Sequence, residues 1–328
     1  MKTLKLLALL CFPLPALAAS IAPLQLLPNT SIHWATQDEG KNLMARPDAF
    51  TKTLSSFDRA VRLQQAEPSS PEAFLEYVSD QARAWTEDEA QRFRVSLESI
   101  QARLERWKLP LPDKVFLIKT TGKDEPAPYT RQNAIILPES VVRSAGKPNG
   151  LLAHELFHVL SRHATTEFRS ALYGVLGFKH CGPVSLPPDI ANRRITNPDS
   201  PLYTHYIQVQ HEGVSKNVIP ILLSESSQFN PSNPKPFFAY LEQKLMVVKQ
   251  DASLWKAATL NGQSRLLEMD AVDQFFDQIG GRRYSVFQPE EILARHFTSL
   301  VLNVTLPAEQ TVQSKLDRVL LTAGKSEN

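Results

Sequence analysis

The chain of 328 residues contains few cysteines, few glycines and almost no net charge. Its two cysteines are Cys11 and Cys181, and Cys11 lies in an N-terminal segment that we expect to be removed. The single remaining thiol cannot form an internal disulfide, which excludes a disulfide-stapled secreted scaffold. A formal net charge of only +2 gives no indication of nucleic-acid binding, which depends on a basic surface.

The chain also lacks a hydrophobic run of the roughly 20 residues that a transmembrane helix needs. Its N-terminus instead has the three parts of a secretory signal peptide. Lys2 and Lys5 precede a short apolar run at 6–12, and Ala16-Leu17-Ala18 provides a cleavage site. We therefore expect residues 1–18 to be a signal peptide and the protein to be exported, either secreted or held in a bacterial periplasm.

Proline outnumbers glycine by 24 to 12, which indicates many rigid loops. We expect a mainly helical N-terminal region at 19–110 and a catalytic domain at 111–328. Nine prolines fall within 181–236, and a stretch of this kind is either a linker or an ordered loop around a cleft. We favour a cleft loop because the stretch also contains polar and aromatic candidates for a site: Tyr203, His205, Tyr206, His211 and Glu212.

The pattern of apolar residues predicts an α+β fold, with a small mixed sheet, an active-site helix and flanking helices. The clearest signal is a capping box formed by Thr86 and Glu89, followed by an apolar stripe at helical spacing. The expected helices are 48–66, the one that follows Thr86, one that begins near Pro148 and one that begins at Pro289. The expected strands are 115–121 and 133–137, together with a hairpin of 237–241 and 244–248.

The most informative motif is His154-Glu155-Leu156-Phe157-His158, which has the HExxH pattern. Two histidines four residues apart on a helix project from one face, so both imidazoles can reach one Zn²⁺. Glu155 lies beside them and can move a proton between an attacking water and a leaving amine. The other residues from 151 to 160 are apolar, which predicts a buried helix. The alternative is that both histidines are core residues hydrogen-bonded to the backbone.

A catalytic zinc needs a third protein ligand. In metzincins this is a histidine ten residues after the first, with a glycine that turns the chain. Here Ala164 occupies the ligand position and Ser161 the glycine position, while His163 comes one residue too early. On a continuing helix, His163 would point away from His154. The metzincin arrangement is therefore excluded.

The segment Phe287-Gln-Pro-Glu-Glu-Ile-Leu-Ala-Arg-His-Phe297 resembles the Pro-Glu-Glu-Ile-Leu-Ala motif of bacterial secreted gluzincin-like zinc peptidases of poorly defined function. The segments 194–201 (Arg-Ile-Thr-Asn-Pro-Asp-Ser-Pro) and 172–178 (Leu-Tyr-Gly-Val-Leu-Gly-Phe) are also similar to that group. The resemblance covers roughly 115–305 and leaves the N-terminal part unexplained. It implies a zincin-like fold in which a glutamate from a second helix is the third zinc ligand, and an edge strand that can pair with an extended peptide.

Alignment with the gluzincin pattern makes Glu291 the third ligand. The acid that usually follows four residues later, and orients a ligand histidine, is replaced here by Arg295, although a backbone carbonyl can take its place. The helical period places Glu290 within the apolar stripe, so Glu290 is the alternative ligand. Glu167 and Glu212 are weaker candidates. Four residues have side chains suited to oxyanion stabilisation: Tyr284, His296, His205 and Tyr206.

These observations predict a zinc-dependent peptidase in which His154, His158 and Glu291 hold Zn²⁺ and Glu155 is the general base. The expected partner is a peptide or protein substrate, with neither nucleic acid nor a membrane span. One alternative is a catalytically inactive zincin-like binding module in the periplasm, suggested by Arg295. Another is a structural exported protein with a chance motif. The sequence leaves open the substrate, the oligomeric state and the presence of a pro-segment within 20–110.

Overall fold

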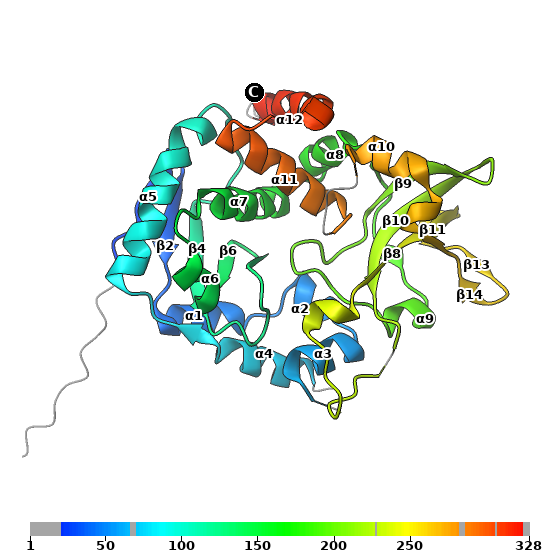
Figure 1. Cartoon of the computed structure of the whole chain (residues 1–328), viewed down its shortest axis with the longest axis horizontal. Coiled ribbons are helices and arrows are strands. Elements are labelled where there is room, and N and C mark those ends of the chain that lie inside the picture. Colours follow the sequence, from blue (N-terminus) through cyan, green and yellow to red (C-terminus); the bar gives the residue numbers. More distant parts are fainter. Residues whose placement is uncertain (1–20, 66–69, 227, 282–285, 306, 324–328) are drawn as a thin grey trace, which may run out of the picture.

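The computed structural model describes residues 21–65, 70–226, 228–281, 286–305 and 307–323 (Figure 1). The expected signal peptide at 1–18 lies outside these residues. The chain is an α+β protein, as predicted. Its α-helices are α1 (Gln37–Met44), α2 (Ala49–Thr53), α3 (Ser56–Leu63), α4 (Pro71–Ser79), α5 (Glu87–Leu104), α6 (Glu139–Ser144), α7 (Asn149–His163), α8 (Thr166–Gly174), α9 (Pro188–Ala191), α10 (Asp273–Ile279), α11 (Pro289–Leu302) and α12 (Gln310–Thr322).

The strands form two main sheets and one small hairpin. They are β1 (Leu24–Leu27), β2 (Thr30–Trp34), β3 (Ala82–Arg83), β4 (Lys114–Thr120), β5 (Tyr129–Arg131), β6 (Ala134–Pro138), β7 (Lys179–His180), β8 (Val184–Ser185), β9 (His205–His211), β10 (Val214–Leu223), β11 (Glu242–Asp251), β12 (Leu254–Ala257), β13 (Thr259–Leu260), β14 (Gln263–Ser264) and β15 (Leu266–Glu268). Short 3₁₀ turns are η1 (Phe237–Tyr240), η2 (Met269–Ala271) and η3 (Pro307–Glu309).

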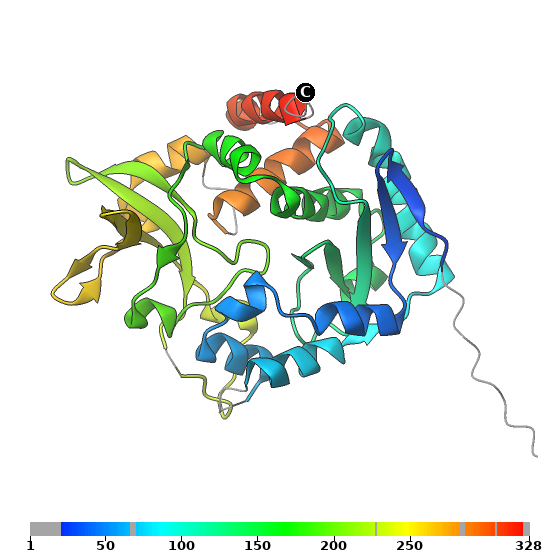
Figure 2. The same cartoon turned by 180° about the vertical axis from the view of Figure 1, so that it is seen from behind.

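The first sheet has the order β1-β2-β4-β6-β5, and β3 pairs with β4. It is mixed, because β2, β4 and β6 run parallel while β1, β3 and β5 are antiparallel to their neighbours. Alternate side chains of a strand point to opposite faces, and both faces of β6 are buried. Ile135 and Leu137 pack with α5 and α7, whereas Ala134 and Ile136 pack on the side of α1 and α4. The sheet is therefore a layer between helices (Figures 1 and 2).

The predicted boundary at residue 110 runs through this sheet. The N-terminal region is rich in helix, as expected, but β1 and β2 also belong to it. Strand β2 pairs in parallel with β4, from Ser31 opposite Lys114 to Trp34 opposite Leu117. The N-terminal region thus contributes strands to the same sheet as the region that follows it.

The second sheet was not predicted. Its order is β7-β9-β10-β11-β12-β8, with β15 paired to β11. It lies at the opposite end of the molecule from the first sheet, and α7 and α11 lie between the two (Figure 1). The Pro-rich stretch 181–236 is therefore not one continuous loop, because it contains β8, α9, β9 and β10. Pro220 lies in β10 beyond the part that pairs with β9, where its missing N–H leaves no ladder bond unmade.

Two other element predictions were wrong. The helix expected at 48–66 is broken into α2 and α3, because Leu54 is extended and the Ser55 side chain caps α3 by accepting the N–H of Asp58. The strand expected at 244–248 lies within β11, but its expected hairpin partner at 237–241 is not a strand. Residues 237–240 are the 3₁₀ turn η1, and β11 pairs with β10, β12 and β15 instead.

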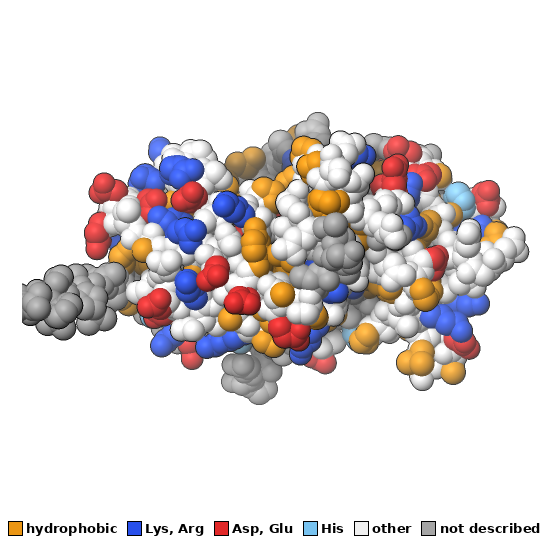
Figure 3. All heavy atoms as spheres, turned by 90° about the horizontal axis from the view of Figure 1, so that it is seen from below, with side chains coloured by type: hydrophobic (Ala, Val, Ile, Leu, Met, Phe, Trp, Pro, Cys, Tyr) orange, Lys and Arg blue, Asp and Glu red, His pale blue; other side chains and the backbone are white. Residues whose placement is uncertain are grey.

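The remaining predicted helices and strands agree with the structure. Thr86 and Glu89 form the capping box that begins α5, and α11 begins at Pro289. The expected strands are β4 and β6. None of the helices described is both long enough and apolar enough to span a bilayer. Acidic and basic side chains are interspersed on the face of the molecule shown in Figure 3.

Candidate metal centre and active site

Helix α7 carries the HExxH motif on the side that faces α11. Its apolar residues, including Leu152, Leu156 and Phe157, are buried in the main core. This packing fixes the helix and with it the two imidazoles. The rings of His154 and His158 have centroids 4.7 Å apart, nearly perpendicular at 83°. His158 is 1% exposed as a side chain, whereas His154 is 30% exposed.

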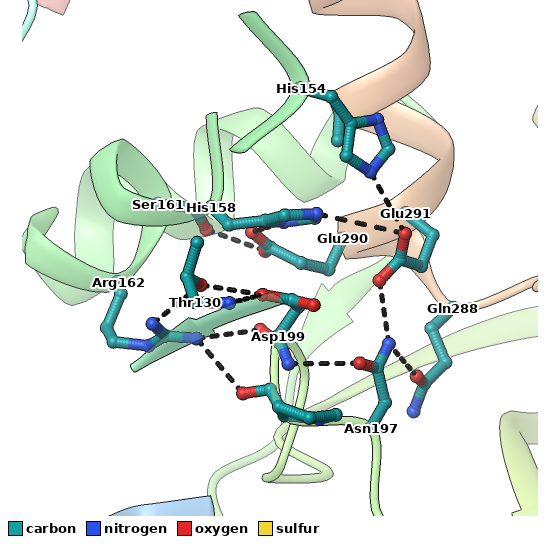
Figure 4. A network of polar contacts seen from close by, with 12 residues as sticks. Thr130, His154, His158, Ser161, Arg162, Asn197, Asp199, Gln288, Glu290 and Glu291 are labelled. Atoms are coloured by element: carbon teal, nitrogen blue, oxygen red, sulfur yellow. Dashed lines mark hydrogen bonds and ion pairs between the residues drawn. The ribbon is translucent and has the colours of Figure 1, made fainter. Parts of the chain in front are cut away.

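Glu291, in the first turn of α11, points toward both imidazoles (Figure 4). Its Oε2 lies 3.3 Å from Nε2 of His154 and 3.8 Å from Nε2 of His158. These three residues form a group whose potential ligand atoms all lie within 4.8 Å of one another. Donors bonded to a tetrahedral Zn²⁺ at 2.0–2.1 Å are separated by about 3.3 Å. The spacing of the three side chains therefore suits one small metal ion.

The polar atoms around His158 also fit a cation. Nε2 of His158 is buried and makes no hydrogen bond within the described residues. Burial lowers the pKa of His158, but Asp199, Glu291 and Glu290 more than offset this and raise it to about 10. A surrounding that favours a proton so strongly also favours a metal cation, which has to replace that proton to bind the imidazole.

Glu290 points away from Glu291 and lies behind His158 (Figure 4). Its Oε1 is 3.0 Å from Nδ1 of His158, and its Oε2 accepts hydrogen bonds from Ser161 Oγ at 2.7 Å and from the Tyr173 hydroxyl. A ligand histidine commonly donates its other ring N–H to a carboxylate, which fixes the ring orientation. Glu290 thus occupies the place of the acid expected at Arg295, whose side chain is 42% exposed and lies near Glu309. Glu290 is only 2% exposed, which agrees with its position in the apolar stripe.

Asn197 contacts the other oxygen of Glu291. Its Nδ2 donates to Glu291 Oε1 at 2.7 Å and to Gln288 Oε1 at 3.0 Å. The turn at Asn197-Pro198-Asp199 explains this orientation. The Asp199 N–H donates to Asn197 Oδ1 at 3.0 Å, a local bond that asparagine favours in turns. Burial raises the pKa of Glu291, but His158, His154 and Asn197 together bring it down to about 2.

Asp199 lies on the other side of His158 and belongs with Glu155 and His158 to a second close group. Its Oδ1 accepts the backbone N–H of Thr130 at 2.8 Å and the Thr130 hydroxyl at 2.6 Å. Thr130 is in the edge strand β5, and Asp199 occupies its backbone N–H, so this N–H is not available to pair with an extended peptide. Arg162 completes the network by donating to the Thr130 hydroxyl and to the Pro198 carbonyl.

Glu155 is 3% exposed, and its Oε2 makes no hydrogen bond within the part of the chain that the structure describes. Burial raises its pKa well above the usual value, and the nearby negative charge of Asp199 raises it further. A carboxyl group of this kind holds a proton more readily near neutral pH than an exposed glutamate does. This property suits a group that accepts and then returns a proton.

A pocket of about 340 Å³ opens beside these side chains. His154, Glu155, Asn197, Asp199 and Glu291 are among the residues that line it. Most of the remaining wall is apolar: Leu151, Ile195, Leu222, Phe237, Phe238, Leu241 and Val286. The pocket therefore places the candidate metal ligands next to a surface that can receive an apolar group.

Several residues singled out in the sequence lie away from this pocket. Glu167 is exposed, and Glu212 is exposed at the β9–β10 turn beside His211 and Arg265. Of the four oxyanion candidates, Tyr284 lies outside the described residues, and His205, Tyr206 and His296 do not line the pocket. Burial raises the pKa of the Cys181 thiol to about 11, which disfavours thiolate chemistry.

Neither Asn197 nor Asp199 was predicted from the sequence to have a role in the site. The only signal for them was the segment 194–201, which was noted for its resemblance. Its polar residues follow no periodic pattern, so their partners could not be predicted. The residues that had suggested a cleft loop, from Tyr203 to Glu212, do not line the pocket, whereas Ile195 to Asp199 do.

Comparisons of the chain with protein-family models, with curated proteins and with solved structures gave no match.

Proposed function

We propose that the protein is a zinc-dependent peptidase. The observation that carries this proposal is the convergence of His154 Nε2, His158 Nε2 and Glu291 Oε2 beside Glu155, whose Oε2 has no hydrogen-bond partner among the described residues. Two histidines and a glutamate are a common ligand set of catalytic zinc, and they leave the fourth position open. The fold would then be zincin-like in its active-site arrangement, as the resemblance to gluzincins implies.

The chain's own residues have separate tasks in this reaction. When bound, Zn²⁺ polarises the substrate carbonyl and makes water a better nucleophile near neutral pH. Glu155 accepts a proton from the attacking water and donates it to the amine as the C–N bond breaks. Glu290 holds the ring of His158, and Asn197 holds the carboxylate of Glu291. The reaction consumes one water and yields a carboxylate and an amine.

The substrate that we propose is a peptide or protein with a large apolar side chain near the cleaved bond. Leu222, Phe237 and Phe238 are among the residues that form the apolar wall of the pocket. An exported location remains part of the proposal, on the basis of residues 1–18.

The alternative of an inactive binding module was suggested by the missing acid at Arg295. Glu290, the residue before Glu291, has a carboxylate that contacts Nδ1 of His158. It can therefore do what the missing acid would do, and the argument from Arg295 for an inactive protein no longer applies. We therefore put the catalytic proposal first.

The test is hydrolysis of a mixed library of internally quenched peptides by the wild-type chain and by Glu155→Gln. The amide side chain keeps the size of Glu155 but cannot accept a proton, so we expect hydrolysis to fall by about 10²–10⁴-fold. Zinc content should be equal in the two proteins, because Glu155 is not a ligand. Removal of zinc with a chelator should abolish the wild-type activity, and added zinc should restore it.

The matched control is Glu89→Gln, a substitution of the same kind in α5, distant from the pocket. It should hydrolyse peptides at the wild-type rate. If Glu155→Gln with bound zinc also does so, the proposed mechanism is wrong. If the wild-type chain binds zinc and peptides without cleaving them, the binding module is the better explanation.

A further inference from the structure

Helix α3 of the N-terminal region lies against residues 194–200, which we call the active-site segment. Asp58 is fully buried, and its Oδ2 accepts the backbone N–H of Thr196 at 2.7 Å. Arg62, one turn further along α3, donates to the Thr196 carbonyl at 3.0 Å. Asp58 and Arg62 also contact each other, with Nε and Oδ1 2.8 Å apart. Both backbone polar groups of Thr196 are therefore bound by side chains of one short helix.

Two more hydrogen bonds hold the same segment against the N-terminal region. The Ser55 hydroxyl donates to the Arg194 carbonyl at 2.7 Å, and the Thr196 hydroxyl donates to the Thr53 carbonyl at 3.2 Å. Arg194 and Thr196 are themselves buried. Buried backbone groups that lose their partners are costly, so this stretch of chain depends on α2 and α3 for its conformation.

The residue that follows Thr196 is the one that contacts the candidate zinc ligand. Asn197 donates to Oε1 of Glu291, while Oε2 of Glu291 faces the two imidazoles. On the other side of Asn197, the turn to Asp199 is fixed by the hydrogen bonds of Asp199 to Thr130. Asn197 therefore lies between two residues whose positions are fixed by hydrogen bonds: Thr196, which is held by α3, and Asp199, which is held by Thr130.

We propose that Asp58 is a positioning residue of the metal site. With Arg62 it fixes the backbone at Thr196, so that Asn197 holds Glu291 in the orientation that binds metal. Residues 53–62 are then a permanent part of the active site, and cleavage of a pro-segment that includes them would damage the site rather than activate it. This inference rests on the proposed zinc peptidase function.

The test compares Asp58→Asn and Asn197→Ala with Glu89→Gln. Asparagine at position 58 keeps the size of the side chain but has an NH₂ group in place of one carboxylate oxygen. Thr196 and Arg62 donate to different oxygens of Asp58, so one of these two donors would face a donor instead of an acceptor. Glu89 is likewise in the N-terminal region and pairs with Lys119 of the first sheet. Among the residues that the structure describes, no hydrogen bond or ion pair joins Glu89 to the active-site segment. Each full-length protein is titrated with zinc against a fluorescent chelator, and thermal unfolding is recorded without metal.

We expect Asn197→Ala to weaken zinc binding by about 10–100-fold, and Asp58→Asn by about tenfold, as for other residues that orient metal ligands. Glu89→Gln should bind zinc like the wild type, even where its melting temperature is lower. A second measurement is the rate of amide hydrogen exchange at Thr196 without metal. Compared with the wild type, this rate should be higher in Asp58→Asn and unchanged in Glu89→Gln.

The inference is overturned if Asp58→Asn binds zinc as tightly as Glu89→Gln does, whatever happens to the melting temperature. It is also overturned if exchange at Thr196 does not change. If Asp58→Asn does not fold, Ser55→Ala removes the bond to Arg194 and is subject to the same two criteria. Absence of zinc in the wild-type protein is a different failure, because it overturns the proposed function together with the metal-positioning role of Asp58. The hydrogen-exchange result would still decide whether α3 anchors the active-site segment.

Discussion

Helix α7 and the active-site segment at 194–200 both contribute to the site, but they do so by different means. In α7 the helical spacing brings His154 and His158 together, because residues four apart share a face. In the segment, Asn197 and Asp199 reach the site through an irregular turn whose partners come from α3, β5 and α11. The comparison teaches that the candidate ligands lie on regular helices, whereas the residues that hold them depend on contacts distant in sequence.

The same contrast exists between two adjacent residues of α11. Glu290 is buried and holds Nδ1 of His158, whereas Glu291 faces the pocket and the two Nε2 atoms. Neighbouring positions on a helix point about 100° apart, so one residue can act as ligand and the next as support. The two glutamates therefore provide the sharpest way to separate binding the metal from positioning its ligands.

The largest difference is expected between Glu291→Ala and Glu290→Gln. Loss of Glu291 would remove one of the three proposed ligands, so the purified variant should contain no stoichiometric zinc. Glu290→Gln leaves all three ligands and should weaken zinc binding by about 10–100-fold. Zinc titration against a chelator measures both. Equal loss in the two variants, or a larger loss in Glu290→Gln, would contradict the assignment of Glu291 as the ligand.

A smaller effect is expected from Asp199→Asn, which keeps a group of the same shape next to Thr130. The negative charge of Asp199 raises the pKa of Glu155. Glu155 acts as a base only when deprotonated, so the acid limb of kcat/KM lies at its pKa. Without the charge that pKa falls, and the acid limb should move to lower pH. A pH profile of peptide hydrolysis measures this, and an acid limb that stays in place or moves to higher pH would refute the coupling of Asp199 to Glu155.

The smallest effect is expected in the apolar wall. Phe238 lines the pocket and is 53% exposed, so Phe238→Ala should have little effect on stability. Loss of a partly exposed aromatic contact is worth about 1 kcal/mol, which corresponds to roughly a fivefold loss of kcat/KM for peptides with a large apolar residue. Peptides with a small residue at the same position should be affected less. An equal loss for both kinds of peptide would show that the wall does not select the side chain.

The elements with strong local signals were predictable from the sequence. The capping box of α5, the apolar runs of β4 and β6, and Pro289 at the start of α11 each reflect interactions within a few residues. The burial of Glu290 followed from the apolar stripe, although its role did not. The break at Leu54 was missed because the Ser55 cap was not recognised within a helical pattern. Strands β8, β9 and β10 were missed because the prolines around them led the whole stretch 181–236 to be interpreted as a loop.

The support for the site could not be predicted in the same way. Asp58 and Arg62 lie more than 130 residues before Thr196, and nothing in their local pattern distinguishes them from surface charges on an ordinary helix. Their role depends on the fold that brings α3 against the active-site segment. The N-terminal region, which the resemblance to gluzincins left unexplained, thereby has a structural reason to be present.

The most direct test of the central claim is the metal content of the purified wild-type chain, measured by elemental mass spectrometry beside His158→Ala. We expect one zinc per wild-type chain and none in the variant, because His158 contributes one of the three converging donors. A wild-type chain that contains no zinc, even after reconstitution with zinc, would contradict the account.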